Sequence, residues 1–290
     1  MHGLRYSHEQ ALENAMLRQR VITALVLAPL TILLILLLPT SAFACLLAMA
    51  FLAAAWEWTR LAGMKSRVTR GVALGVVLIA FVALWMFRAS TWLWPALIAA
   101  GVAGWLLACV WLRHFAFAAA PTPENRNLKL LAGAFVVVPA WVAGVSIHQA
   151  PSYGHVWFFL AMLLVWAADT GAYFAGSYFG KGKRKLAPQI SPGKTWVGVY
   201  GAFATSALVI AVAGWLLDVH DLRLLGLIVV TIVTVASSIV GDLLESLMKR
   251  HANVKDSGAL FPGHGGLLDR LDSVFAALPV FALGKLLLGL

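Results

Sequence analysis

Residues 196–217 read WVGVYGAFATSALVIAVAGWLL, a run of 22 residues that contains no Asp, Glu, Lys or Arg. A helix needs roughly 20 apolar residues to cross the hydrocarbon core of a bilayer, so this run is long enough to span a membrane. Further runs of the same kind bring the number of predicted transmembrane helices to nine. The nine predicted spans cover residues 21–38, 42–60, 71–87, 92–112, 130–148, 156–179, 196–217, 223–244 and 272–289.

The composition also favours a membrane protein. Hydrophobic residues make up 61% of the chain and charged residues 12%, whereas a soluble domain has about 25% charged residues. Cys45 and Cys109 both fall inside predicted spans, where we expect small apolar side chains and not a disulfide or a metal site. The predicted fold class is therefore an all-α polytopic membrane protein.

The distribution of basic residues predicts the orientation of the helices. With the N-terminus in the cytoplasm, 19 of the 22 Lys and Arg residues fall on the inner side, and only Arg88, Arg223 and Lys285 do not. The formal net charge of +10 then indicates attraction to anionic membrane lipids. Nucleic-acid binding is disfavoured, because the basic residues are divided among five segments and do not form one face.

The chain divides into three predicted regions. Residues 1–20 form a cytoplasmic or interfacial tail, residues 21–150 a scaffold of membrane helices, and residues 151–290 the region that carries the chemistry. Within the scaffold, Trp56 and Trp58 are typical of interfacial anchors. We expect Glu57, between them, to reach the headgroup layer, with a role in the site as the alternative.

Charge is concentrated in residues 241–272, which hold five of the twelve Asp and Glu residues of the chain. A polar cluster beside a membrane is costly to maintain and indicates function. Asp242, Glu245, Ser246 and Lys249 have the spacing of one helix face, a set suited to holding a divalent cation and a phosphate. The alternative is solvation of a helix end with an internal salt bridge.

A second acidic pair, Asp269 and Asp272, opens the last predicted span after a glycine-rich loop. Acids at a helix N-terminus complement the macrodipole, which is the purely structural interpretation. Because consecutive spans are antiparallel, Asp242 and Asp269 lie on the same side of the membrane, and we expect them to converge. Carboxylates together with substrate phosphates are typical ligands of Mg²⁺.

Two further features lie in the same half of the chain. Asp169 falls well inside a predicted span, where an acid indicates a cavity, or else a structural hydrogen bond. The segment SPGKT at 191–195 is not a Walker A loop, because Pro188 stands at the required glycine position and no preceding strand is expected. At a helix N-terminus Gly-Lys-Thr still presents N–H groups and an ammonium to an anion, with lipid attraction as the alternative.

Together these motifs resemble the phosphatidate cytidylyltransferase family, also called CDP-diacylglycerol synthases. The similarity rests on a signature of 27 positions and two shorter motifs, and covers about residues 16–290. The segments are SLMKR at 246–250, KDSG at 255–258 and FPGHGGLLDRLD at 261–272, with DTGAYF at 169–174 and SPGKTW at 191–196.

The resemblance implies that CTP and phosphatidate form CDP-diacylglycerol and pyrophosphate, with Mg²⁺ and a K⁺ ion assisting. It implies a bacterial-type inner membrane, phosphatidate in the inner leaflet, a site facing the cytoplasm, and a homodimer. Asp242 and Asp269 would be the metal aspartates, with Glu245, Asp256 and Asp272 behind them. The residues expected to bind or orient phosphate groups are Asp169 (lining the cavity), Ser191, Lys194, Thr195, Ser246, Lys249, Arg250, Lys255, His264 and Arg270.

Other functions remain open at this point. A CTP-dependent lipid kinase would transfer the γ-phosphoryl group and release CDP. A secondary transporter would place its polar site near the membrane midplane, where only Asp169 is plausibly located. A scaffold or chaperone would not require the acidic, glycine-rich loop.

Overall fold

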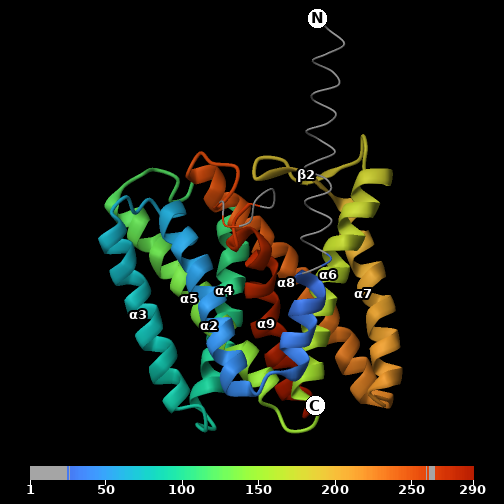
Figure 1. The fold of residues 1–290 in the computed structure, drawn as a ribbon. Helices are drawn as coiled ribbons and strands as arrows, with labels where there is room; N and C mark the ends of the chain where they lie inside the picture. The colour runs from blue at the N-terminus through green and yellow to red at the C-terminus, as the bar shows by residue number, and fades with distance from the viewer. Residues whose placement is uncertain (1–24, 26, 259, 261–264) are drawn as a thin grey trace, which may run out of the picture.

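The computed structural model of the chain describes residues 25, 27–258, 260 and 265–290. Among these residues, eight helices are long and apolar enough to cross a membrane, and they stand side by side in a bundle (Figure 1). The helices are α2 Thr40–Leu61, α3 Arg67–Met86, α4 Leu93–Arg113, α5 Pro123–His148, α6 Gly154–Phe179, α7 Trp196–Leu216, α8 Asp221–His251 and α9 Leu268–Leu288.

The predicted helical membrane fold is confirmed for this part of the chain. α7 begins at the first residue of the predicted run 196–217 and ends one residue short of its last. The other described helices overlap their predicted spans. The predicted first span, 21–38, lies partly outside the described residues, and its described part contains the shorter apolar helix Leu27–Leu37. The predicted tail, residues 1–20, lies wholly outside them.

Two helices extend well past their predicted spans, because hydropathy marks the edge of the lipid and not the end of the helix. α5 begins at Pro123, since Thr122 accepts a hydrogen bond from the backbone N–H of Asn125 (3.3 Å) and proline suits the first helical turn. α8 continues to His251, and its basic last turn complements the helix dipole. The extension of α8 carries the predicted site residues Ser246, Lys249 and Arg250.

The prediction contained no β-strand, and in this respect it was wrong. β1, Lys185–Ala187, pairs antiparallel with β2, Ser191–Thr195, in register Lys185 with Thr195 and Ala187 with Ser191. The turn between the strands is closed by a hydrogen bond from Ile190 N to Ala187 O (3.2 Å). Such a short hairpin is marginal alone, and the burial of Ile190 against the bundle supports it.

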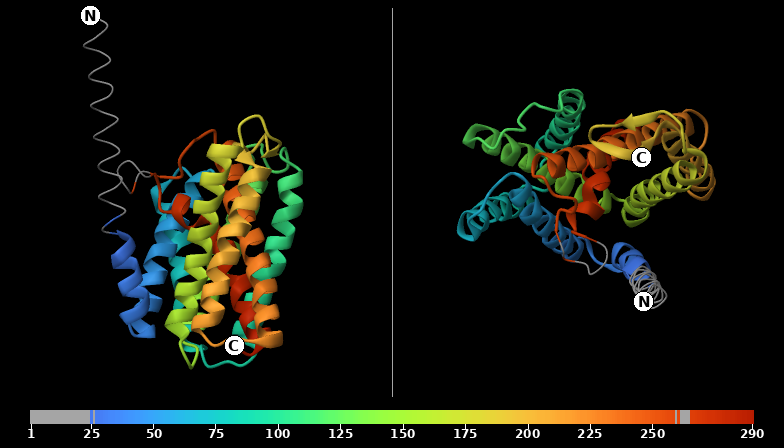
Figure 2. Two further views of the ribbon diagram at one scale, coloured as in Figure 1. Left: turned by 90° about the vertical axis from the view of Figure 1, so that its right-hand side faces the viewer. Right: turned by 90° about the horizontal axis from the view of Figure 1, so that it is seen from above.

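α9 lies inside the bundle and contacts α2, α4, α5, α6 and α8 (Figure 2). Every residue from Ser273 to Ala282 is buried. α8 packs against α9 most closely at Gly241, where an added Cβ would collide with the backbone oxygen of Asp272 and approach Ala276. This close approach brings the neighbouring Asp242 toward α9.

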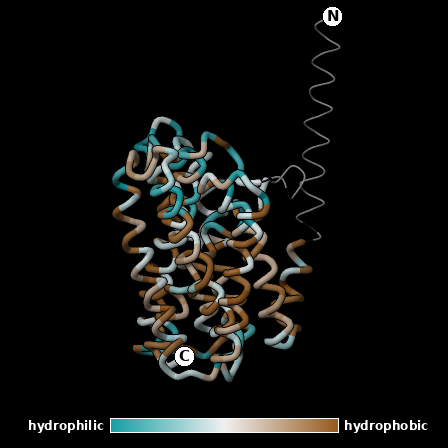
Figure 3. Tube along the Cα trace, turned by 90° about the vertical axis from the view of Figure 1, so that its left-hand side faces the viewer, coloured by the Kyte–Doolittle hydropathy of each residue, from teal (hydrophilic) through white to brown (hydrophobic). Residues whose placement is uncertain are grey.

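Polar residues gather at one end of the bundle, whereas its sides are apolar (Figure 3). The polar end holds the α2–α3, α4–α5 and α8–α9 connections and the β1–β2 hairpin, at the top of Figure 1. Large apolar side chains stand exposed along the sides, including Val72, Val76 and Ile79 of α3. That surface suits contact with lipid tails, since the backbone polar groups are satisfied within the helices.

Candidate active site

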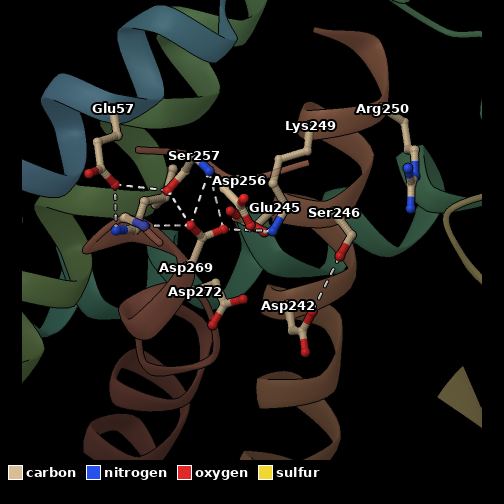
Figure 4. Close-up of polar contacts among 12 residues, drawn as sticks. Glu57, Asp242, Glu245, Ser246, Lys249, Arg250, Asp256, Ser257, Asp269 and Asp272 are labelled. Atoms are coloured by element: carbon tan, nitrogen blue, oxygen red, sulfur yellow. Dashed lines mark hydrogen bonds and ion pairs between the residues drawn. The ribbon is translucent and has the colours of Figure 1, made fainter. Parts of the chain in front are cut away.

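The α8 face predicted from the sequence forms at the polar end of the bundle. Ser246 Oγ donates to Asp242 Oδ1 (3.4 Å), and Lys249 Nζ pairs with Glu245 Oε2 (2.5 Å). Lys249 also donates to Asp269 Oδ1 at 2.7 Å, so that one ammonium joins α8 to the start of α9 (Figure 4). Glu245 is only 1% exposed, and Lys249 is its ion-pair partner. The α8 face therefore contains the internal salt bridge of the structural interpretation, and it also contacts Asp269, as a site would require.

Asp269 is the centre of a hydrogen-bond network at the N-terminus of α9. Its Oδ2 accepts bonds from Ser257 N (3.0 Å), Ser257 Oγ (2.9 Å) and Gly266 N (2.8 Å). Gly265, with φ of +80°, turns the chain into this arrangement, and glycine adopts that conformation without a steric penalty. The Asp269 carboxylate therefore holds the α8–α9 loop, through Ser257 and Gly266, against the first turn of α9.

Glu57 of α2 belongs to this network, and the expectation that it reaches the headgroup layer was wrong. It is 8% exposed, and its carboxylate accepts bonds from Leu268 N (2.8 Å) and Leu267 N (3.2 Å). Its Oε2 also lies 2.8 Å from Ser257 Oγ, whose single hydroxyl proton is shared between Glu57 and Asp269. The N-terminus of a buried helix leaves N–H groups without partners, and Glu57 supplies the acceptor. The sequence signal was available, because Glu57 is the one acid inside the predicted spans before residue 150.

Arg60, one turn after Glu57, holds the same loop by its backbone. Its Nη2 donates to Ser257 O (2.7 Å) and Asp256 O (3.1 Å). The glycines on either side of this contact leave room for the acid, because a Cβ at Gly258 or Gly266 would collide with the Glu57 carboxylate. The end of α2 therefore positions the signature segment, although this helix belongs to the predicted scaffold.

A pocket of about 410 Å³ opens beside this network, between α6, α7, α8 and the hairpin. Its polar lining includes Asp169, Lys194, Thr195 and Asp242, and Ala168, Leu186 and Ile239 are among its apolar walls. Lys194 forms an ion pair with Asp242. The pocket is therefore lined by residues from three separately predicted places in the sequence: Asp169 in α6, Lys194 in the SPGKT segment and Asp242 in α8.

Two carboxyl groups, those of Asp169 and Asp242, line this pocket, and a third, that of Asp272, lies near both of them. Asp169, Asp242 and Asp272 lie close enough for each pair to interact electrostatically, and Lys194 is their nearby cation. Arg270 also acts on Asp169. None of the contacts among the described residues joins Asp242 directly to Asp269. Ser246 bonds to Asp242 and Lys249 bonds to Asp269, and both side chains come from α8, which packs on α9.

The remaining predicted residues have different surroundings. Thr195 caps α7, its Oγ1 accepting from Gly198 N at 3.2 Å, and Arg250 donates to Ile190 O at 3.0 Å, which ties α8 to the hairpin. Ser191 opens β2 and is half-buried, whereas Lys255 is exposed in the α8–α9 loop. His264 lies outside the described residues.

The donor set fits a hard divalent cation that completes its coordination with substrate oxygens. No group of three or more His, Cys, Asp or Glu side chains in the described part of the chain is arranged to hold a metal ion by itself. Mg²⁺, however, uses one or two protein carboxylates plus phosphates. Among the described residues, Asp242 contacts Lys194 and, weakly, Ser246, so it retains acceptor capacity. The oxygens of Asp269 already accept bonds from Lys249, Ser257 and Gly266, so a metal ion there would replace one of these partners.

The fold and the site define a class of protein: a polytopic membrane protein whose polar end combines acids and cations suited to phosphate chemistry. Residues 18–287 match the model of the cytidylyltransferase family, and the chain belongs to that family. It is accordingly an enzyme of the nucleotidyltransferase class.

Similar curated proteins carry one name. The phosphatidate cytidylyltransferase of Pseudomonas aeruginosa is 43% identical over 273 residues, which cover 92% of this chain and 96% of that protein. The phosphatidate cytidylyltransferase of Haemophilus influenzae is 37% identical and covers 92% of this chain and 98% of its own length. The protein of that name from Bacillus subtilis is 42% identical over 135 residues, about half of each chain.

Proposed function

We propose that this chain transfers the cytidylyl group of CTP to phosphatidate, which yields CDP-diacylglycerol and pyrophosphate. The observation that carries the proposal is the pocket between α6, α7 and α8, where Lys194, Asp169 and Asp242 meet apolar walls at the polar end of a membrane bundle. A phosphate on a lipid and the triphosphate of a soluble nucleotide can meet at such a boundary. Relatives named for this activity match nearly the whole chain.

The reaction requires little acid–base chemistry from the protein. An oxygen of the phosphatidate phosphate, already an anion, forms a bond to the α-phosphorus of CTP. The bond from that phosphorus to the bridging oxygen of the β-phosphate breaks, and pyrophosphate leaves with the electron pair. The protein must hold two polyanions in line and neutralise their charge, and positioning and electrostatics supply most of such catalysis.

The basic residues around the pocket are suited to that neutralisation. Lys194 lies in the pocket and would contact a substrate phosphate together with Ser191 and Thr195. Lys249 and Arg270, at the facing ends of α8 and α9, would neutralise the triphosphate and the departing pyrophosphate. Further phosphate contacts are proposed for Ser246, Arg250, Lys255 and His264.

Mg²⁺ is the proposed metal, with K⁺ as a second cation. Such a divalent cation would supply positive charge to offset the charge of the substrate phosphates. Asp242 and Asp269 would hold it, and the carboxyl groups of Asp169 and Asp272 lie near Asp242. Binding would compete with Lys194 for Asp242, so that this ammonium becomes available to a substrate phosphate.

The proposed location is a bacterial-type inner membrane, with nine spans, a cytoplasmic N-terminus and the site facing the cytoplasm. The gathering of the basic connections at one end of the bundle supports this orientation. Phosphatidate of the inner leaflet and CTP then reach the same pocket. Anionic lipids and a second copy of the chain are proposed as further partners.

The test is incorporation of nucleotide into lipid. Purified protein is incubated with phosphatidate, Mg²⁺ and CTP labelled either on the α-phosphorus or on the γ-phosphorus. The α-label should appear in the lipid fraction and the γ-label in pyrophosphate, and chelation of Mg²⁺ should stop both. Transfer of the γ-label to lipid would identify a lipid kinase instead, and no label in lipid would reject both activities.

A further inference from the structure

A second pocket, of about 1000 Å³, lies at the polar end of the bundle and is distinct from the candidate active site. It is bounded by the α2–α3 turn, the segment leading into α5, and the C-terminal end of α8. No Asp or Glu is among the described residues that line it. Five of its lining residues are basic: Arg60, Lys65, Arg126, Lys129 and His251. A volume of this order accommodates a small-molecule ligand or a lipid headgroup.

Lys129 is the residue that distinguishes this pocket from an ordinary basic surface. It is 4% exposed, and its ammonium has no hydrogen-bond or ion-pair partner among the described residues. The ammonium is not among the fully buried atoms that lack a partner, so it keeps contact with the space of the pocket, where a bound anion would supply the opposite charge. Attraction of exposed Lys65 and Arg126 to the membrane surface follows from topology alone, but the burial of an unpaired Lys129 does not.

His251 lines the same pocket from the last turn of α8. Its Nε2 bonds to Phe115 O (2.7 Å), while its buried Nδ1 has no partner within the described part of the chain. Lys129 lies close enough to His251 to interact with it electrostatically. The pocket thus combines the ammonium of Lys129, three exposed cations and further donors in Asn127 and Asn253, with no acid among the described residues that line it.

We propose that this pocket binds a phosphate-bearing anion. Arg and Lys donors recognise phosphate oxygens through charge-assisted hydrogen bonds, and the hydroxyl and amide groups of Ser66, Thr69 and Asn127 extend the donor set. The anion is either the headgroup of an anionic lipid at the membrane surface or a soluble phosphate or pyrophosphate. The shared chemistry is a phosphoryl group bearing negative charge.

The pocket is connected to the candidate active site through Arg60. This guanidinium lines the pocket and also donates to the backbone oxygens of Asp256 and Ser257, in the loop that surrounds Asp269. A bound anion would share Arg60 with that loop. Binding of an anion in the pocket would therefore change the contacts of Arg60 with the loop that contains Asp256 and Ser257. The anion need not be a substrate for this effect.

The test is a lysine footprint of the full chain. Acylation of Lys65 and Lys129 by an amine reagent is followed by peptide mass spectrometry, with exposed Lys181 as the internal control. The reference sample is in a maltoside detergent without phosphate. One arm adds inorganic phosphate or pyrophosphate, and the other places the protein in nanodiscs containing phosphatidylglycerol.

Protection of Lys65 and Lys129 beyond that of Lys181 is the expected result. Protection in the first arm identifies a soluble anion, and protection confined to the second identifies a lipid headgroup. Unchanged reactivity of both lysines in both arms, or equal protection of Lys181, would overturn the proposal.

Variants make the footprint quantitative. In Lys129→Met and Arg126→Ala, the anion level that half-protects Lys65 should rise about tenfold, because each loses a charged donor. Lys181→Met removes an equal charge from an exposed loop and should leave that level unchanged. Arg126 is exposed, so its replacement leaves the fold intact even if Lys129→Met does not. Equal half-protection in Arg126→Ala and Lys181→Met would count against the site.

Discussion

At the scale of single residues, the two aspartates predicted to hold metal, Asp242 and Asp269, make different contacts. Asp242 contacts Lys194 and Ser246 at the edge of the pocket, whereas Asp269 accepts bonds from three residues that hold the loop in place. Removal of one negative charge therefore has different structural consequences at the two positions. Their substitution separates a role in turnover from a role in stability.

Asp242→Asn should reduce CTP-dependent turnover at least about a hundredfold, since it removes a charge that offsets a bound cation. Its thermal unfolding temperature in detergent should change little. Asp269→Asn should also abolish turnover and in addition lower stability by about 3 kcal/mol, because it leaves a partly buried Lys249 without that partner. Turnover and thermal unfolding are measured on both variants. Substantial activity in both would reject the metal-site proposal.

Lys194→Ala tests the hairpin residue that enters the pocket. The apparent KM for CTP or for phosphatidate should rise about tenfold, because one charge-assisted contact to phosphate is lost. Lys183→Ala, in the exposed turn before β1, is the control and should retain both KM values. If the two variants behave alike, the basic residues of this segment serve only to attract the membrane surface.

At the scale of elements, the sequence predicted the helices well and the contacts between them poorly. Apolar runs of span length locate α7 almost to the residue, because lipid enforces helical hydrogen bonding. The pairing of Glu57 with the N-terminus of α9 joins residues about 210 positions apart, and no periodicity reports such a contact. The same holds for the hairpin, whose three-residue first strand is too short to give an alternating pattern.

The link from α2 to α9 gives a test of positioning. Glu57→Gln keeps the size of the side chain but replaces one acceptor oxygen with a donor that faces backbone N–H groups. We expect kcat to fall about tenfold or more with KM for CTP nearly unchanged, because the loop around Asp269 is misplaced while the pocket persists. Glu124→Gln, at the start of α5, is the control with the same chemical change. A fall in stability with normal kcat would make Glu57 a structural acid only.

The contact of α8 with α9 depends on the absence of a side chain at Gly241. Gly241→Ala should cost about 1–3 kcal/mol and displace Asp242 from the pocket, since the added methyl group meets the Asp272 backbone. Gly75→Ala on α3 is a matched control, because nothing lies within 4 Å of its added Cβ. Thermal unfolding and turnover should both decline in the first variant alone. Equal effects would mean that the helix contact does not position the site.

At the scale of the whole molecule, the distribution of Lys and Arg is the basis of the proposed orientation of the site in the membrane. The helices alternate in direction, so the connections rich in Lys and Arg all meet at the end that holds both pockets. The cost of moving basic residues across a membrane favours keeping that end in the cytoplasm. In the proposed orientation, CTP would reach the site without crossing the membrane, and phosphatidate would reach it from the adjoining leaflet.

Cysteine labelling tests this orientation directly. In a chain with Cys45 and Cys109 replaced by Ala, Lys183→Cys marks the polar end and Arg88→Cys the opposite end. A membrane-impermeant maleimide added to intact spheroplasts should label Arg88→Cys and should reach Lys183→Cys only after permeabilisation. The reverse pattern would place the pocket outside the cell, where the proposed supply of CTP fails and the assigned reaction would have no substrate. Labelling of both positions would instead mean that the bundle inserts in two orientations, with only one of them able to use CTP.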